Sequence, residues 1–288
     1  MPRILSFWVI FALLAASVVA EYSQAYAHHS MELACVAYCN NDELVDSWSC
    51  PMCKQLPQID YAHSIRDDAE SVIVVIMTEQ TDSGKILHVA FRGTVDIKNW
   101  VEDFKAWQEK FDEWPECKVH DGFARAYRAV EEQIRREVQL LMAKGDITAV
   151  RTTGHSLGGA IATLCAVDLR TSGIVDRDTF LGTYTFGEPR VGNPDYVDLV
   201  EGTLDEHYRV VHWQDLVPMV PPHMLGIYHH AANEVWYNED MSDYRICDGS
   251  GEDPTCSLSQ PTWVGHVDYS IDCHLHYLGI FTSECVCS

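Results

Sequence analysis

The chain has 288 residues, and its 43 acidic side chains outnumber 20 basic ones to give a formal net charge of −23. A surface this acidic repels nucleic acids and anionic lipids at neutral pH, so we expect no nucleic-acid partner. Beyond a leader, the remaining length suits a single α/β domain over residues 21–288, because no Pro/Gly/Ser-rich linker, repeat or low-complexity tract divides it.

Residues 1–20 have the form of a secretory signal peptide. Arg3 precedes an apolar run over 4–16, and small residues follow as far as Ala20. We expect cleavage after Ala20, with Ala27 as the second choice. An uncleaved membrane anchor is the alternative, but the run is short for a spanning helix, and no other segment is apolar enough to cross a bilayer. The sequence therefore predicts a secreted protein without a membrane span.

Eleven cysteines in a chain with such a leader indicate an oxidising compartment, and their odd number leaves at least one thiol unpaired or bonded to another molecule. The spacing of Cys50 and Cys53 also occurs in zinc and thioredoxin-like sites. No second Cys or His pair at ligand spacing accompanies them, so we expect a structural disulfide and neither a metal nor another cofactor. A late loop from Cys247 to Cys256 is also expected to be closed by a disulfide.

Strands and helices are predicted in alternation along most of the chain. Apolar patterning predicts a strand over 71–78 and a returning strand over 85–92. Apolar residues at helical spacing predict a helix from Phe123 to Leu141, ended by Gly145. The later elements are a strand over 149–153, a helix over 160–167, a strand over 182–187, a helix from Pro194, and strands over 207–212 and 233–237. This alternation predicts a mostly parallel sheet with helices on both faces.

The stretch 154–160, Gly-His-Ser-Leu-Gly-Gly-Ala, matches the G-x-S-x-G pattern of a nucleophile elbow. Its serine projects from a strand-to-helix turn so tight that side chains two positions away would collide with neighbouring backbone, so both positions are glycine. The N–H of Leu157 opens the following helix, where backbone donors stabilise negative charge. The pattern alone is weak, but an expected strand over 149–153 and an apolar helix over 160–167 flank it. We therefore expect Ser156 to be a nucleophile rather than part of an ordinary strand–helix turn.

A serine nucleophile needs a base to remove its proton and an acid to orient that base. Asp215 follows an apolar strand at the carboxyl end of the sheet and precedes a rigid turn at Pro218. This placement favours it over the other downstream acids, which are Asp195, Asp198, Asp205 and Asp240. Spacing alone leaves the base open among the downstream histidines, which are His223, His229, His230, His266, His274 and His276.

Sequence blocks characteristic of one family stand in a fixed order along the chain. They are residues 91–94 with Asn99 and Trp100, then 120–123, 154–160, 185–193, 212–218 with 221–222, and 274–277. Together they resemble the class 3 lipase family, which comprises fungal-type secreted triacylglycerol lipases. The resemblance covers nearly the whole chain after the leader. It implies an α/β-hydrolase-like fold, a mostly parallel central sheet flanked by helices, with a short helical lid.

The resemblance also implies a role for each residue of a triad. Ser156 would be the nucleophile, Asp215 the acid and His274 the general base. The second oxyanion donor would be Thr94, whose backbone N–H and hydroxyl join the N–H of Leu157. His155 matches the family's elbow without a part in proton transfer, and we expect it to be a packing residue.

The resemblance further implies a set of disulfides. The expected pairs are Cys50–Cys53, Cys39–Cys285 and Cys247–Cys256. Cys35 stands a helical turn before Cys39, and Cys287 stands two residues after Cys285, so Cys35–Cys287 is expected as an additional bridge. The remaining cysteines are Cys117, Cys165 and Cys273. Of these, Cys165 is expected to be a buried apolar residue on the elbow helix.

The family carries its lid just after the position of Thr94. Apolar side chains at helical spacing follow there, namely Ile97, Trp100, Val101, Phe104, Trp107 and Phe111, with charged residues on the other face. A core-packed helix would show the same stripe. Its place beside the oxyanion donor favours a lid whose apolar face covers the site when closed and contacts a lipid surface when open.

From these features we expect a secreted serine lipase that hydrolyses acylglycerol esters through an acyl-enzyme at a lipid–water interface, as a monomer without a cofactor. A phospholipase A1, a galactolipase or a feruloyl-type esterase would share the triad. An acyltransferase would pass the same acyl group to an alcohol, and an inactive lipid-binding relative would keep the fold without turnover.

Overall fold

The computed structural model describes residues 21–102, 108–111, 114–223, 226–260 and 267–287. The expected signal peptide lies outside these ranges, so its cleavage stays a prediction. Within the described part, no helix is both long and apolar enough to span a bilayer.

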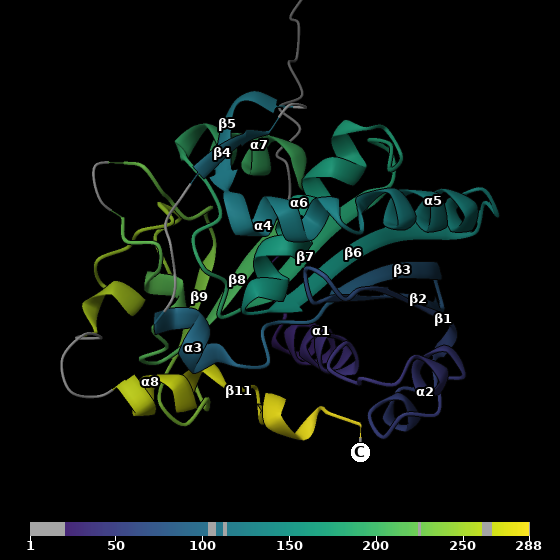
Figure 1. Cartoon of the computed structure of the whole chain (residues 1–288), viewed down its shortest axis with the longest axis horizontal. Coiled ribbons are helices and arrows are strands. Elements are labelled where there is room, and N and C mark those ends of the chain that lie inside the picture. Colours follow the sequence, from purple (N-terminus) through teal and green to yellow (C-terminus); the bar gives the residue numbers. More distant parts are fainter. Residues whose placement is uncertain (1–20, 103–107, 112–113, 224–225, 261–266, 288) are drawn as a thin grey trace, which may run out of the picture.

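An eight-stranded sheet organises the fold (Figure 1). Its strands, in spatial order, are β1 Ile59–Asp67, β2 Val72–Thr81, β3 Gly84–Phe91, β6 Ile147–His155, β7 Phe180–Phe186, β8 Glu206–His212, β9 Glu234–Tyr237 and β10 Tyr244–Ile246. The pairs from β3 to β9 are parallel, and the strands outside them are antiparallel additions at the two edges. The expected mostly parallel sheet is confirmed. Its parallel strands bring the carboxyl ends of β6, β7 and β8 to one edge, where α/β proteins place their sites.

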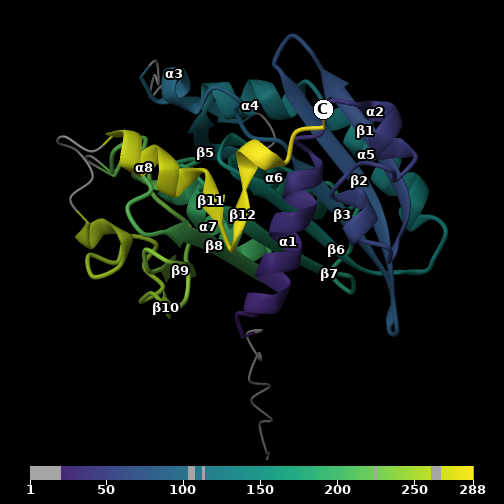
Figure 2. The same ribbon diagram turned by 90° about the horizontal axis from the view of Figure 1, so that it is seen from below.

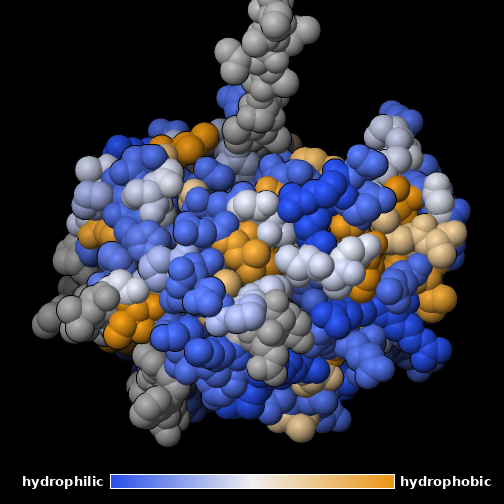
Figure 3. Space-filling view, turned by 90° about the horizontal axis from the view of Figure 1, so that it is seen from above, coloured by the Kyte–Doolittle hydropathy of each residue, from blue (hydrophilic) through white to orange (hydrophobic). Residues whose placement is uncertain are grey.

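Helices cover both faces of this sheet. One face carries α4 Asp121–Arg128, α5 Glu131–Met142, α6 Leu157–Thr171 and α7 Pro194–Thr203 (Figure 1), which bury the largest apolar cluster among the described residues against the strands. The other face carries α1 Gln24–Val36, which Figure 2 shows lying across β6 and β7. The short helix α2 Asp42–Asp46 lies beside β1. Seen from the α4–α7 side, the surface is mostly hydrophilic, with scattered apolar side chains (Figure 3).

The helix predicted from Phe123 to Leu141 is two helices, α4 and α5, and the prediction of one was wrong. The break falls at Val130, whose backbone leaves the helical region at ψ −8°. Both helices bury the same apolar stripe, because Phe123, Val130 and Leu141 are all buried. The apolar spacing therefore continues across the break and gives no sign of it.

The segment predicted as one lid helix has a different structure at its two ends. Ile97 to Glu102 form the helix α3, but Gln108–Phe111 form the strand β4, which pairs antiparallel with β5 Trp114–His120. The assignment of Phe111 to a helix was wrong, because the hairpin hydrogen bonds hold it extended. Phe104 and Trp107 lie outside the described residues.

Four disulfides are present among the described residues, and two of them correct the expected pairing. Cys50–Cys53 and Cys247–Cys256 are bonded as expected. The other two bonds are Cys35–Cys285 and Cys39–Cys287, with Cα–Cα distances of 5.1 and 4.6 Å, so the expected Cys39–Cys285 and Cys35–Cys287 are wrong. The end of α1 and the C-terminal segment run side by side in matching order, a register that residue spacing does not reveal. The thiols of Cys117, Cys165 and Cys273 are unbonded and buried.

Candidate active site

Ser156 occupies the sharp turn between β6 and α6. Its backbone lies at φ 61° and ψ −130°, a strained conformation for a residue with a side chain. A Cβ at Gly154 would collide with the carbonyl of Gly158, and a Cβ at Gly158 would collide with the carbonyl of Phe91. The two glycines of the motif therefore allow strand and helix to approach as closely as this turn requires. The N–H of Ser156 donates to the carbonyl of Phe186 at 2.8 Å and anchors the turn to β7.

Asp215 and His274 form a fully buried pair near this turn. His274 ends the helix α8 Val267–His274, and its Nδ1 lies 2.8 Å from Oδ2 of Asp215. Both side chains are 0% exposed. The same Oδ2 accepts from the hydroxyl of Tyr277 at 2.5 Å, and Oδ1 accepts from the N–H of Val217 at 2.8 Å. Both carboxylate oxygens of Asp215 thus accept hydrogen bonds, which fixes this side chain against the ring of His274.

Gly187 leaves room for this pair. Its φ is +59°, in the left-handed region, and a Cβ there would lie 2.7 Å from Oδ2 of Asp215 and 2.8 Å from Nδ1 of His274. A side chain at this position would push the two groups apart. Gly187 follows β7 directly, so the end of this strand places the residue without a side chain next to Asp215 and His274.

Three buried polar atoms at the site have no hydrogen-bond partner within the described residues. They are Oγ of Ser156, Nε2 of His274 and Oγ1 of Thr94. Thr94 follows Gly93, where an added Cβ would lie 3.1 Å from Cβ of Ser156, so the Thr94 segment passes beside the serine. Buried groups of this kind are costly and call for an explanation. An acyl-transfer site needs a hydroxyl as nucleophile, a ring nitrogen as base and a donor for the oxyanion, and these three atoms are of those kinds.

His155, the residue before Ser156, holds the backbone of His274 in place. Its Nε2–H donates to the backbone carbonyl of His274 at 2.7 Å, and its Nδ1 accepts from the hydroxyl of Tyr38 at 2.7 Å. Burial holds the pKa of His155 well below its usual range, so the ring stays neutral. Its place is one of support, as expected of a packing residue.

The other candidate acids and bases have different surroundings. Asp195 and Asp198 are exposed on α7, Asp205 pairs with Arg170, and Asp240 binds Ser242. Among the histidines, His223 faces His229 at a ring distance of 5.0 Å, and His230 donates to the carbonyl of Pro218. His266 lies outside the described residues.

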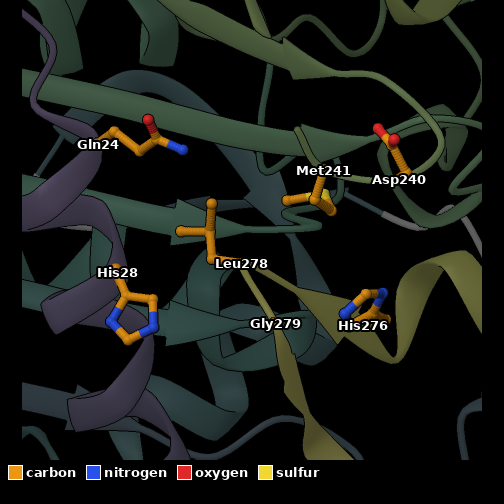
Figure 4. A pocket seen from close by; sticks show the side chains of 7 residues that line it. All are labelled: Gln24, His28, Asp240, Met241, His276, Leu278 and Gly279. Carbon is orange, nitrogen blue, oxygen red and sulfur yellow. The ribbon is translucent and has the colours of Figure 1, made fainter. Parts of the chain in front are cut away.

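His276, two residues beyond His274, faces a separate surface pocket. Figure 4 shows it among the residues that line this pocket, which include His28, Asp240 and Met241. Its ring stacks on Phe281 with centroids 4.2 Å apart, and burial lowers its pKa. Of the histidines within the described ranges, His274 is the one that faces Asp215.

An apolar wall borders the site. Ile97 and Trp100 of α3 pack against Leu216, Val217, Ile271 and Leu275, which border Asp215 and His274 along the chain. Trp100 also stacks on Phe123, with centroids 6.4 Å apart. Ser156 is 1% exposed, so this arrangement is closed to solvent.

Comparison with known proteins decides the family. Residues 88–225 match the sequence model described as lipase (class 3). The crystal structure of a lipase from Rhizopus microsporus var. chinensis is 31% identical, covers 92% of this chain and 91% of its own, and superposes with a TM-score of 0.79. This chain belongs to the class 3 lipase family.

Curated relatives of this class 3 lipase chain extend the comparison. A lipase of Rhizomucor miehei is 34% identical over 212 residues, which is 73% of this chain and 56% of that protein. The secreted mono- and diacylglycerol lipase 1 of Fusarium solani is 33% identical over 172 residues, or 57% of this chain and 50% of that protein. The chain thus spans about half the length of these curated relatives.

Several residues of the site escape sequence reasoning. Tyr277 and Gly187 lie inside blocks that carry the resemblance, but nothing in a one-dimensional pattern says that they touch Asp215. Tyr38 stands after α1, an element that apolar periodicity did not predict. Only the folded arrangement brings these residues to the serine and the acid.

Proposed function

We propose that this class 3 lipase is a carboxylic ester hydrolase in which Ser156 is the nucleophile, His274 the general base and Asp215 the acid that orients it. The observation that carries the proposal is the buried bond between His274 and Asp215 at 2.8 Å, with Nε2 of His274 and Oγ of Ser156 left free for chemistry. A ring held at Nδ1 by a carboxylate presents an unprotonated Nε2, as a base for a serine must.

The reaction follows two acyl-transfer steps. Ser156 attacks the ester carbonyl while His274 takes its proton, and Asp215 stabilises the resulting imidazolium. His274 then protonates the leaving alcohol, which departs from the tetrahedral intermediate. Water, activated by the same ring, attacks the acyl-enzyme and releases the carboxylic acid and free Ser156.

The oxyanion is stabilised by the N-terminus of α6 and by Thr94. The first N–H groups of a helix have no intrahelical partner, and Leu157 is the first residue of α6. The unpartnered hydroxyl of Thr94 supplies a further donor beside the serine. Each such donor typically lowers the barrier by about 3 kcal/mol.

The substrate class is an acylglycerol presented at a lipid–water interface. The apolar wall of Ile97, Trp100, Leu216 and Ile271 suits an acyl chain and not a polar sugar or peptide. The Fusarium solani relative is named for mono- and diacylglycerols, which supports the same class here. We assign α3, with Ile97, Trp100 and Val101, to a lid that must move, because Ser156 is inaccessible as it stands.

Secretion is part of the proposal. Four disulfides are stable in an oxidising compartment, and the family includes a protein named as secreted. The leader over residues 1–20 would direct this route, and the mature domain would act as a monomer.

The test compares hydrolysis of emulsified trioleoylglycerol, a soluble butyrate ester and phosphatidylcholine by the wild type and by Ser156→Ala. We expect a preference for trioleoylglycerol that disappears in the variant. A preference for phosphatidylcholine would show that the substrate is a phospholipid rather than an acylglycerol, and it would leave the proposed triad unchanged. Hydrolysis at the wild-type rate by Ser156→Ala would overturn the triad itself.

A further inference from the structure

Two histidines from other elements bind the C-terminal end of α8, the helix that carries His274. The last carbonyls of any helix lack intrahelical partners. Here Nδ1 of His212 lies 2.8 Å from the carbonyl oxygen of Cys273, and Nε2 of His155 lies 2.7 Å from that of His274. His212 ends β8 and His155 ends β6, so the sheet holds this helix end through two imidazole rings.

The two rings differ in what their second nitrogen faces. For His155 it is the hydroxyl of Tyr38, which can donate, so a neutral ring satisfies both contacts. For His212 it is the carbonyl oxygen of Glu239, at 2.9 Å from Nε2. A carbonyl only accepts, so both nitrogens of His212 must donate, and only the imidazolium ion carries a proton on each. Turning the ring over would set two carbon atoms against the carbonyls instead.

We propose that His212 is held as an imidazolium ion and acts as a positioning residue for His274. Its ring holds the carbonyl next to His274, and its own carbonyl accepts the N–H of Asp215 at 2.8 Å. One residue therefore sets the place of both the base and the acid. A cation at a helix C-terminus is also favourable toward the helix dipole. The charge of His212 is inferred from its two carbonyl partners alone, and only its effect on catalysis rests on the proposed function.

The groups that face His212 from every packed element are compatible with a cation there. From β11, His276–Tyr277, come the ring of His276 at 5.5 Å and that of Tyr277 at 6.0 Å, whose hydroxyl oxygen accepts from the N–H of His212. The nearby acids are Asp215 and Glu239, and the other titratable neighbours are Cys273 and Tyr269 of α8. Burial and then the charge of His212 lower the pKa of His276, which keeps that ring neutral.

The kinetic test measures kcat/KM for a soluble butyrate ester as a function of pH in the wild type and in His212→Gln. Glutamine can donate to only one of the two carbonyls and does not titrate. We expect the variant to be slower by about tenfold at neutral and mildly acidic pH, the usual size for a lost bond to a charged group. The ratio of the two values should approach one at alkaline pH, where the wild type loses its second donor.

A ratio that stays constant with pH would show that His212 serves only as a packing residue and would overturn the proposal. His276→Gln is the matched control, because it removes a neighbouring imidazole that contacts neither carbonyl. It should keep a wild-type pH profile.

A second measurement keeps the proposal falsifiable if His212→Gln does not fold or if no ester is hydrolysed. Nitrogen-15 spectra of histidine-labelled wild-type protein at neutral pH, with each ring signal assigned to its residue, should show a proton on both ring nitrogens of His212. A spectrum in which the ring of His212 has one bare nitrogen would overturn the assignment. Because this readout needs no turnover, failure of the inference and failure of the proposed function are separable.

Discussion

At the scale of single residues, the acid of the proposed triad is held by hydrogen-bond donors in addition to His274. The carboxylate of Asp215 receives donors from Tyr277, Val217 and His274, all buried. Burial, and then the charge of Asp215, raises the pKa of Tyr277 well above its ordinary value. The hydroxyl therefore keeps its proton and acts as a donor over the whole working range of pH.

Replacing Tyr277 with phenylalanine removes this donor and leaves the ring in place. A hydrogen bond to a charged group contributes about 1.5–3 kcal/mol, so we expect kcat to fall by at least about tenfold with little change in KM. Kinetics on a soluble ester, with a thermal unfolding curve for each protein, would measure this. An unchanged kcat would mean that Val217 and His274 suffice to hold the acid.

Residue patterns predict the chemistry of this site better than its geometry. The elbow glycines, Asp215 after its strand and the late histidines could all be read from the sequence, because tight turns and strand ends impose residue types locally. Spacing alone does not select His274 over His276, since both are near the C-terminus; the family resemblance selects His274, and in the structure that ring faces Asp215. The contacts of Tyr277, Gly187 and Tyr38 join segments far apart in the chain, which no local pattern encodes.

At the scale of elements, the helix α3 is the part that the proposed function makes responsible for access to Ser156. Its apolar side chains Ile97 and Trp100 pack beside α8, and Lys98 forms an ion pair with Asp268 at 2.9 Å across the same two helices. Exposed pairs of this kind contribute little, so the apolar contacts provide most of what keeps α3 in place. Periodicity predicted an apolar stripe here, but it did not predict where the helix gives way to the hairpin of β4 and β5.

Trp100→Ser tests the role of α3 at an interface. We expect a loss of at least about fivefold in activity on emulsified trioleoylglycerol, because the variant lacks an aromatic anchor for the lipid surface. Activity on a soluble butyrate ester should change much less. Equal losses on both substrates would mean that Trp100 is a structural residue only, packed on Phe123.

At the scale of the whole molecule, α1 is tied to the sheet by a partly buried ionic cluster and to the C-terminal segment by disulfides. His29 of α1 lies 3.1 Å from the carboxylate of Glu79 on β2, which also accepts from His88 on β3 at 2.7 Å. Burial opposes the charge on His29, but the bonds to Glu32 and Glu79 outweigh it and raise its pKa to about 9. Despite burial, the two histidines hold the pKa of Glu79 below its usual range.

This cluster makes the free energy of unfolding depend on pH. A raised pKa stabilises the folded state fully below the unfolded value of about 6.5. That contribution is lost as the pH rises through about 9. Because the pKa of Glu79 is lowered, its carboxylate stabilises the folded state fully above its ordinary pKa of about 4.5. This contribution is lost as the pH falls below that value. The stability contributed by His29 and Glu79 is therefore greatest between about pH 4.5 and 6.5.

Urea unfolding at several pH values would measure this dependence in the wild type and in His29→Gln. We expect the decline between pH 6.5 and 9 to be smaller in the variant than in the wild type. His28→Gln, at a more exposed neighbouring position, should keep the wild-type curve. A decline of the same size in all three proteins would assign it to groups elsewhere.

The central claim is that Ser156, activated by His274 and Asp215, forms the acyl-enzyme. The most direct measurement is the mass of the protein after reaction with an alkyl fluorophosphonate, followed by identification of the modified peptide. We predict one adduct per chain on Ser156, formed with loss of ester hydrolysis, much slower in His274→Ala and absent in Ser156→Ala. Loss of hydrolysis with the adduct on another residue, or hydrolysis at the wild-type rate by Ser156→Ala, would contradict this account.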